Sequence, residues 1–146
     1  ETGATITNTA TATGGGIATP ISDTAVITAE AQADLTISKS LSPAVVTENG
    51  QLTYTFVIEN TGNTPAIATD NLVVTDTFSP ILNPITVTYN GTTWAAGTNY
   101  TYNPATGEFA TLPGQITVPA ATYTQNTDGS YTVTPGVAVL TVTGTV

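Results

Sequence analysis

Residues 34–41 of this chain read Asp34-Leu-Thr-Ile-Ser-Lys39-Ser-Leu41. Apolar and hydroxyl-bearing residues alternate along the stretch, which is typical of a β-strand with one face turned to a core. Lys39 falls in step with the apolar residues and not with the hydroxyl-bearing ones. It is also the single basic residue in a chain of 146 residues, so its place on this face needs a physical reason.

The same alternation recurs through most of the chain and predicts an all-β protein. Threonine and alanine dominate, valine and isoleucine are frequent, and no long helix-forming run is present. Seven or more short strands separated by turn residues predict an immunoglobulin-like antiparallel β-sandwich. The expected strands and hairpins cover residues 4–13, 24–29, 35–41, 51–59, 72–78, 85–89, 100–109, 123–133 and 137–146. Asn90-Gly91 is a strong signal for a tight hairpin turn after the strand 85–89.

The first part of the chain has the pattern of a separate arm. Gly14-Gly15-Gly16 separates two strand-like segments, and residues 30–34 (Glu-Ala-Gln-Ala-Asp) contain no glycine, proline or asparagine. A hairpin back onto the preceding strand would need such turn residues. We therefore predict a two-stranded N-terminal donor arm over residues 1–31 and a β-sandwich body over residues 32–146.

Two more polar residues lie in phase with apolar faces. Asp76 is in phase with the apolar residues Val74 and Phe78. Asn8 is in phase with the apolar residues of the first strand, which are Ala4, Ile6, Ala10 and Ala12. A lysine, an acid and an asparagine that all point inward are the three parts of a self-forming isopeptide crosslink.

The chemistry of that crosslink explains the residue types. Enclosure among apolar groups disfavours a charged amine and a charged carboxylate, so Lys39 could attack as a free amine and Asp76 could donate a proton. A hydrogen bond from Asp76 would polarise the Asn8 carbonyl and stabilise the oxyanion that forms on attack. Ammonia leaves, and the resulting amide needs neither an enzyme nor a cofactor.

Two plainer interpretations compete with the crosslink. Lys39 and Asp76 could form a buried ion pair with Asn8 as a hydrogen-bonding neighbour, although such pairs often add little stability. Alternatively, Lys39 could extend past a strand end into water. The coincidence of three polar residues in phase favours the crosslink.

Composition excludes several classes of function. A net charge of -9 with one cation excludes nucleic acid binding and argues against anionic membrane surfaces. Without cysteine or histidine, disulfides, thiolate or histidine catalysis and the common transition-metal sites are excluded, so we expect no metal, no cofactor and no enzyme activity on an outside substrate. No run of eighteen or more apolar residues is present, so no membrane span is expected. The lack of cysteine and methionine and the scarcity of lysine and arginine favour an extracellular or cell-surface location.

Three motifs make residues 33 to 79 resemble the DUF11 family of immunoglobulin-like repeats of bacterial surface proteins. They are Ala33-Asp-Leu-Thr-Ile-Ser-Lys39-Ser-Leu-Ser-Pro43, Leu52-Thr-Tyr-Thr-Phe-Val-Ile-Glu-Asn60-Thr-Gly62 and Val73-Val-Thr-Asp76-Thr77. In that family the repeat usually closes with a strand of the type Ile-Thr-Asn-Thr-Ala, here Ile6 to Ala10, which in this chain comes first. The resemblance thus implies a circularly permuted order, with the family's crosslink falling on Lys39 and Asn8 and with Asp76 as the assisting acid.

The permuted order leads to an expected function. A body without its closing strands exposes core and unpaired edges, and an arm that carries those strands would fill the groove of a neighbour by donor-strand complementation. We expect a structural subunit of an extracellular bacterial fibre or pilus, a head-to-tail homopolymer sealed by Lys39–Asn8 isopeptide bonds between subunits. The alternative is a repeat of a surface adhesin or stalk protein with an intramolecular bond, of which a closed monomer with its arm folded back is a variant.

Overall fold

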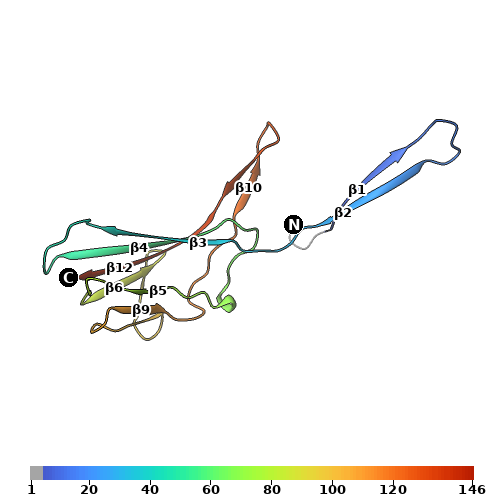
Figure 1. The fold of residues 1–146 in the computed structure, drawn as a ribbon. Helices are drawn as coiled ribbons and strands as arrows, with labels where there is room; N and C mark the ends of the chain where they lie inside the picture. The colour runs from blue at the N-terminus through green and yellow to red at the C-terminus, as the bar shows by residue number, and fades with distance from the viewer. Residues whose placement is uncertain (1–4) are drawn as a thin grey trace. The chain divides into compact units, whose positions relative to one another are not determined.

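The computed structural model describes residues 5–146 (Figure 1). Its secondary structure is all-β, with antiparallel sheets compatible with an immunoglobulin-like β-sandwich, as the sequence predicts. The chain divides into two compact units, Glu1–Gln32 and Ala33–Val146, where the sequence suggested a boundary between residues 31 and 32. Ala4, the first residue of the first expected strand, lies outside the described residues.

The first unit is a β-hairpin of two strands, β1 (Thr5–Ala12) and β2 (Ile21–Thr28), and every residue of both strands is exposed. Gly14, Gly15 and Gly16 in the connecting loop have φ angles of 90°, 61° and 82°, in the left-handed region that favours glycine. One face of the hairpin is mostly apolar and the other carries threonine, serine and Val26. The apolar face is formed by Ile6, Asn8, Ala10, Ala12, Ile21, Asp23, Ala25 and Ile27.

The second unit is the body, and its larger sheet has five strands in the order β3-β4-β12-β6-β7. These strands are β3 (Leu35–Ser42), β4 (Gln51–Asn60), β12 (Gly136–Thr145), β6 (Ile85–Tyr89) and β7 (Thr92–Trp94). The smaller sheet has three strands in the order β5-β9-β8, namely β5 (Thr75–Thr77), β9 (Glu108–Thr111) and β8 (Tyr100–Tyr102). A separate hairpin of β10 (Thr122–Gln125) and β11 (Tyr131–Thr134) and a single 3-10 turn, η1 (Ala68–Asp70), complete the body.

The core lies between the two sheets of the body. Four alternating residues of β4 point inward and are 3–4% exposed, namely Leu52, Tyr54, Phe56 and Ile58. Phe78 stacks on Tyr54 with ring centroids 4.9 Å apart and also contacts Phe109 at 5.7 Å. Burial of large side chains of this kind stabilises a fold by about 1.5–3 kcal/mol each.

Local turn chemistry also follows the sequence. Asn90 and Gly91 have φ angles of 47° and 80° and join β6 to β7 as the predicted tight turn. The strand expected over residues 72–78 is shorter, however, and covers only Thr75–Thr77. At its N-terminal end, the amide of Val74 bonds to the side-chain hydroxyl of Thr111 at 2.9 Å, which replaces a ladder bond at that position.

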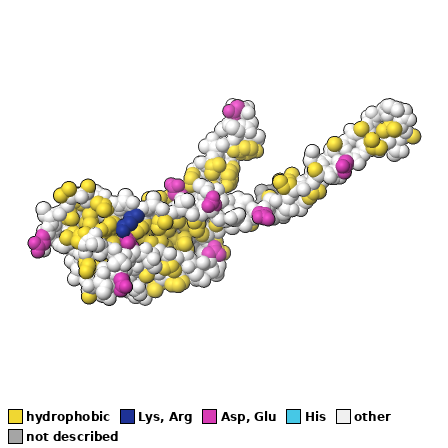
Figure 2. Space-filling view, in the orientation of Figure 1, with side chains coloured by type: hydrophobic (Ala, Val, Ile, Leu, Met, Phe, Trp, Pro, Cys, Tyr) yellow, Lys and Arg dark blue, Asp and Glu magenta, His cyan; other side chains and the backbone are white. Residues whose placement is uncertain are grey.

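The unequal sheets leave one inner face of the body uncovered. β3 is an edge strand of the five-stranded sheet, and β5 is an edge strand of the three-stranded sheet. The inner-face residues Leu35, Ile37 and Leu41 are therefore 36%, 56% and 48% exposed, whereas the residues of β4 beside them are buried. Figure 2 shows hydrophobic side chains on both sides of the single basic side chain on this face of the body.

Candidate functional site

Lys39 is held on the inner face of β3 by the register of the sheet. It pairs with Phe56 of β4, whose side chain is buried in the core. The Lys39 ammonium lies 4.6 Å from the ring centroid of Tyr54, 5.7 Å from that of Phe56 and 5.9 Å from that of Phe78. These rings attract a cation through their electron-rich faces and hold the end of the side chain over the core.

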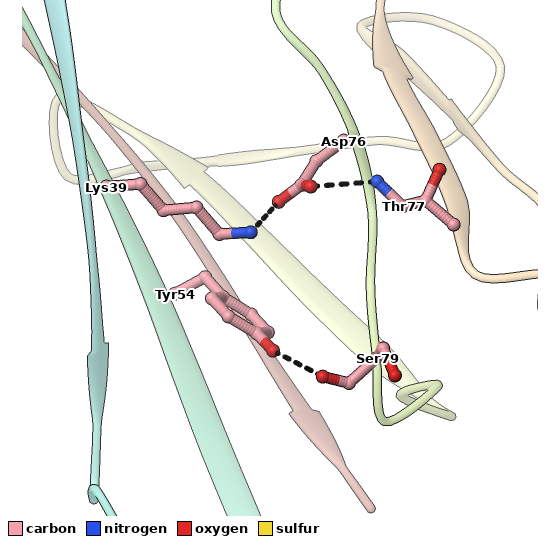
Figure 3. A network of polar contacts seen from close by, with 5 residues as sticks. All are labelled: Lys39, Tyr54, Asp76, Thr77 and Ser79. Carbon is pink, nitrogen blue, oxygen red and sulfur yellow. Dashed lines mark hydrogen bonds and ion pairs between the residues drawn. The ribbon is translucent and has the colours of Figure 1, made fainter.

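Asp76 reaches the same point from the opposite sheet. It lies on β5 between the buried residues Val74 and Phe78, and its side chain is 17% exposed. One carboxylate oxygen, Oδ1, accepts a hydrogen bond from the backbone N–H of Thr77 at 2.8 Å. The other, Oδ2, forms an ion pair with the Lys39 ammonium (Figure 3). This oxygen is enclosed, and among residues 5–146 it meets no hydrogen-bond donor besides that ammonium.

Lys39 is less buried than the sequence suggested. Its side chain is 41% exposed, because β3 is an edge strand whose inner face no second layer covers. The lysine does not extend away into water, since its ammonium turns across to Asp76. The body thus contains a Lys39–Asp76 ion pair between its two sheets, as one alternative expected, but the lysine is partly exposed and Asn8 lies on the other unit.

Asn8 lies on the first unit. It takes its predicted place on the apolar face of β1, in step with Ile6 and Ala10, and it pairs with Ala25 of β2. Within residues 5–146 its side chain has no hydrogen-bond partner, and with Asp23 and Ala25 it lines a shallow depression of about 200 Å³.

An apolar groove lies beside the ion pair, at the end of the body where β3 begins. Its volume is about 300 Å³, and it lies between β3 and the segment that leads into β5. Its lining residues are Leu35, Thr36, Ile37, Ile58, Leu72, Val73, Val74 and Thr75. The groove therefore joins the two open sheet edges over most of the length from Leu35 to the ion pair.

The comparisons with known proteins do not assign the chain: no family model, no curated protein and no solved structure matches it. The resemblance to DUF11 repeats stays a prediction from the motifs quoted above. In the part of the chain that the structure describes, no helix is long and apolar enough to span a membrane. The same residues contain no group of three acidic, histidine or cysteine side chains placed to hold a metal ion.

Sequence reasoning missed the aromatic surroundings of the ion pair. Tyr54 and Phe78 both fall on the apolar phase of their segments, but the pattern within a strand does not say which strands face each other. The contact of Lys39 with Tyr54 depends on the β3–β4 register, and the contact with Phe78 depends on the packing of the two sheets. The Tyr54 hydroxyl also donates to the carbonyl of Ser79 at 3.3 Å, which ties the ring to the segment after β5 (Figure 3).

Proposed function

We propose that this chain is the structural subunit of an extracellular bacterial fibre, assembled head to tail by donor-strand complementation and sealed by a Lys39–Asn8 isopeptide bond between subunits. The observation that carries the proposal is that one chain contains both halves of the crosslink, on complementary apolar surfaces. The body has a lysine–carboxylate pair on an uncovered inner face, and the hairpin has an asparagine on its apolar face.

Strand number and length support strand donation. A three-stranded sheet faces a five-stranded one, so adding two strands at the β5 edge would make the layers equal. β1 and β2 have eight residues each, as does β3, whose inner face they would cover. The open backbone groups of an edge strand favour this kind of addition.

Apolar complementarity supports it as well. The hairpin presents Ile6, Ile21 and Ile27 on the face that carries Asn8, and these side chains are 57%, 63% and 64% exposed. The groove presents exposed Leu35 and Ile37. Covering both surfaces would remove a large apolar area from water, which is the main favourable term in association.

The reaction follows from enclosure of the ion pair. When an arm covers the groove, loss of water disfavours separated charges, and the proton of the Lys39 ammonium passes to Asp76 to leave a neutral amine and a carboxylic acid. Nζ then attacks the side-chain carbonyl carbon of Asn8, and Asp76 donates a hydrogen bond to the oxygen that gains charge. A C–N bond to Nζ forms, the C–N bond to the amide nitrogen of Asn8 breaks, and one proton from the attacking amine leaves with that nitrogen as ammonia, while Asp76 ends as the carboxylic acid that took the first proton.

Head-to-tail growth follows if the arm enters another copy. Residues 30–34 carry no turn-forming glycine, proline or asparagine that would reverse the chain onto its own groove. A contact between two different surfaces of identical subunits propagates as an open filament unless it closes a ring. The second candidate function, a stalk or adhesin repeat with an intramolecular bond, uses the same site in one polypeptide.

Mass spectrometry with two matched variants tests the proposal. The denatured product should be lighter by one ammonia per bond and should yield a branched peptide joining the segments around Asn8 and Lys39. Asp76→Ala should abolish the bond, whereas Glu59→Ala, which removes an exposed acid from β4, the strand beside β3, should not. Oligomers that survive boiling in detergent favour the fibre, and a monomer that has lost ammonia favours the stalk. An unchanged mass in all samples would exclude the crosslink.

A further inference from the structure

The β10–β11 hairpin carries an apolar face that nothing in the described structure explains. Within residues 5–146 its two strands pair only with each other, and they extend from the body (Figure 1). One face carries Tyr123, Tyr131 and Val133, which are 48%, 62% and 45% exposed, together with Gln125 opposite Tyr131. The opposite face consists of threonines. Because an isolated two-stranded hairpin is only marginally stable in water, an uncovered apolar face of this kind indicates a contact surface.

The base of this hairpin lies at the end of the body where β3 begins. The Tyr123 hydroxyl donates to the carbonyl of Thr61 at 2.6 Å, and the N–H of Thr61 donates to the carbonyl of Asp34 at 2.9 Å. Tyr123 belongs to the apolar face, so this face is turned to the β3 side of the body. The groove lined by Leu35 and Ile37 opens at the same end. The apolar hairpin face and the groove thus lie at the same end of the body.

The next step rests on the proposed function, because it uses Asn8 at Lys39 as the reference point. Every strand pairing in the sheets of the body is antiparallel. The chain runs along the groove from Leu72 to Asp76, so β1 added antiparallel to β5 would run back toward the start of β3. Ala12 lies four positions after Asn8, and Leu35 lies four positions before Lys39. With Asn8 at Lys39, Ala12 would therefore lie beside Leu35, the first residue of β3.

The loop of the arm would then extend beyond the groove. Residues 13–20, which we call the arm tip, connect β1 to β2. About half of them would extend roughly 13 Å past Leu35 at 3.3 Å per residue, which equals the length of the four-residue strands β10 and β11. The arm tip has no charged residue, and its one large apolar side chain, Ile17, is 45% exposed.

We infer that the β10–β11 hairpin is a second binding site for the arm, and that its apolar face binds the arm tip of a second copy of this chain. The contact would fix the register of the donated strand. A slip of two residues keeps the apolar face of β1 inward but replaces Asn8 at Lys39 with Ile6 or Ala10. The groove alone discriminates weakly among these registers, whereas a contact at the tip selects the one that brings Asn8 to the lysine.

A pair of full-length chains isolates one junction for the test. A donor with Lys39→Ala can only give Asn8, and an acceptor with Asn8→Ala can only give Lys39, so mixing them yields a covalent dimer that a denaturing gel detects. Tyr131→Thr in the acceptor should slow dimer formation at limiting concentration on the order of three- to tenfold. The same substitution in the donor should leave the rate unchanged, because the donor's own hairpin is not at this junction.

The double-mutant cycle completes the test. Ile17→Thr in the donor should slow the reaction as much as Tyr131→Thr in the acceptor, and the two together should add little, because both remove one contact. Val133→Thr in the acceptor, a change of similar volume on the same face, should also slow it, with the urea midpoint of the acceptor unchanged. If the unsubstituted pair forms the dimer normally and the substitutions have additive effects or none, the second binding site is refuted, whereas the proposed crosslink is not. Failure of the unmodified pair to form a dimer would overturn the proposed function and this inference with it.

Discussion

Replacing Ile37 by threonine should separate assembly from folding. Ile37 lies on the inner face of β3, lines the groove and is 56% exposed in the body. Because it is already largely in contact with water, Ile37→Thr should cost the folded body little stability. In the proposed fibre the same side chain is covered by the arm of a neighbour, so the substitution should weaken assembly.

The size of the effect follows from the exposed fraction. Complete burial of an isoleucine side chain is worth about 1.5–3 kcal/mol, and the 56% that is exposed corresponds to roughly 1–1.5 kcal/mol of that. The concentration needed for assembly should therefore rise about five- to tenfold. Ile58, which pairs with Ile37 in the β3–β4 register and is 3% exposed, provides the matched control. Ile58→Thr should lower the free energy of unfolding by about 2–4 kcal/mol.

The measurement uses a reversible system. In an Asn8→Ala background, which cannot crosslink, sedimentation gives the critical concentration and urea unfolding of the dilute protein gives stability. Ile37→Thr should raise the critical concentration without moving the urea midpoint, and Ile58→Thr should move the midpoint. Equal loss of stability in the two variants, with assembly unchanged by Ile37→Thr, would refute the placement of the arm over β3.

Three further predictions concern the crosslink and the hairpin. A Lys39→Ala subunit added to assembling protein should cap covalent growth, and fibres of that variant alone should form yet dissolve in hot detergent, as a denaturing gel would show. Tyr54→Phe loses only the bond to Ser79, worth about 1 kcal/mol in urea unfolding, and should crosslink normally, whereas Tyr54→Leu removes the ring beneath the ammonium and should slow the loss of ammonia. Hydrogen bonds from the Ser130 hydroxyl and then from its backbone N–H lower the pKa of Asp128, so the stability that this carboxylate gives the β10–β11 turn is present above its ordinary pKa and is lost as pH falls through the lowered one. The protection of the Ser130 amide against hydrogen exchange, measured relative to the intrinsic rate at each pH, should fall over that acid range, and Asp128→Ala should remove the dependence.

Alternation and turn chemistry were sufficient to predict much of the fold. The inward phase of β4 and the Asn90-Gly91 turn could be deduced from single segments, because side-chain direction and positive φ are local properties. The phase of Lys39 and Asp76 was equally local, and both point to the interior between the sheets. Asn8 likewise lies on the apolar side of its strand.

The remaining features depend on how the layers combine. Alternation tells which side of β3 faces inward but not whether a second sheet covers it, so the 41% exposure of Lys39 could not be predicted from the segment alone. The shortening of the strand around Val74 results from a hydroxyl on Thr111, 37 residues away in the chain. The apolar face of β10–β11 could be derived from the sequence, whereas its position beside the start of β3 required the contact between Tyr123 and Thr61.

The place of Lys39 on the first strand of the body has a mechanical consequence for a fibre crosslinked as proposed. Each subunit would be gripped at Asn8 by one neighbour and at Lys39 by the other, so the covalent load path through a subunit runs only from residue 8 to residue 39. Residues 40–146 lie outside that path and carry tension only through packing and hydrogen bonds. Pulling on the fibre would stretch β1, β2 and the first half of β3. The remaining strands of the body could unfold and refold without breaking the covalent connection along the fibre.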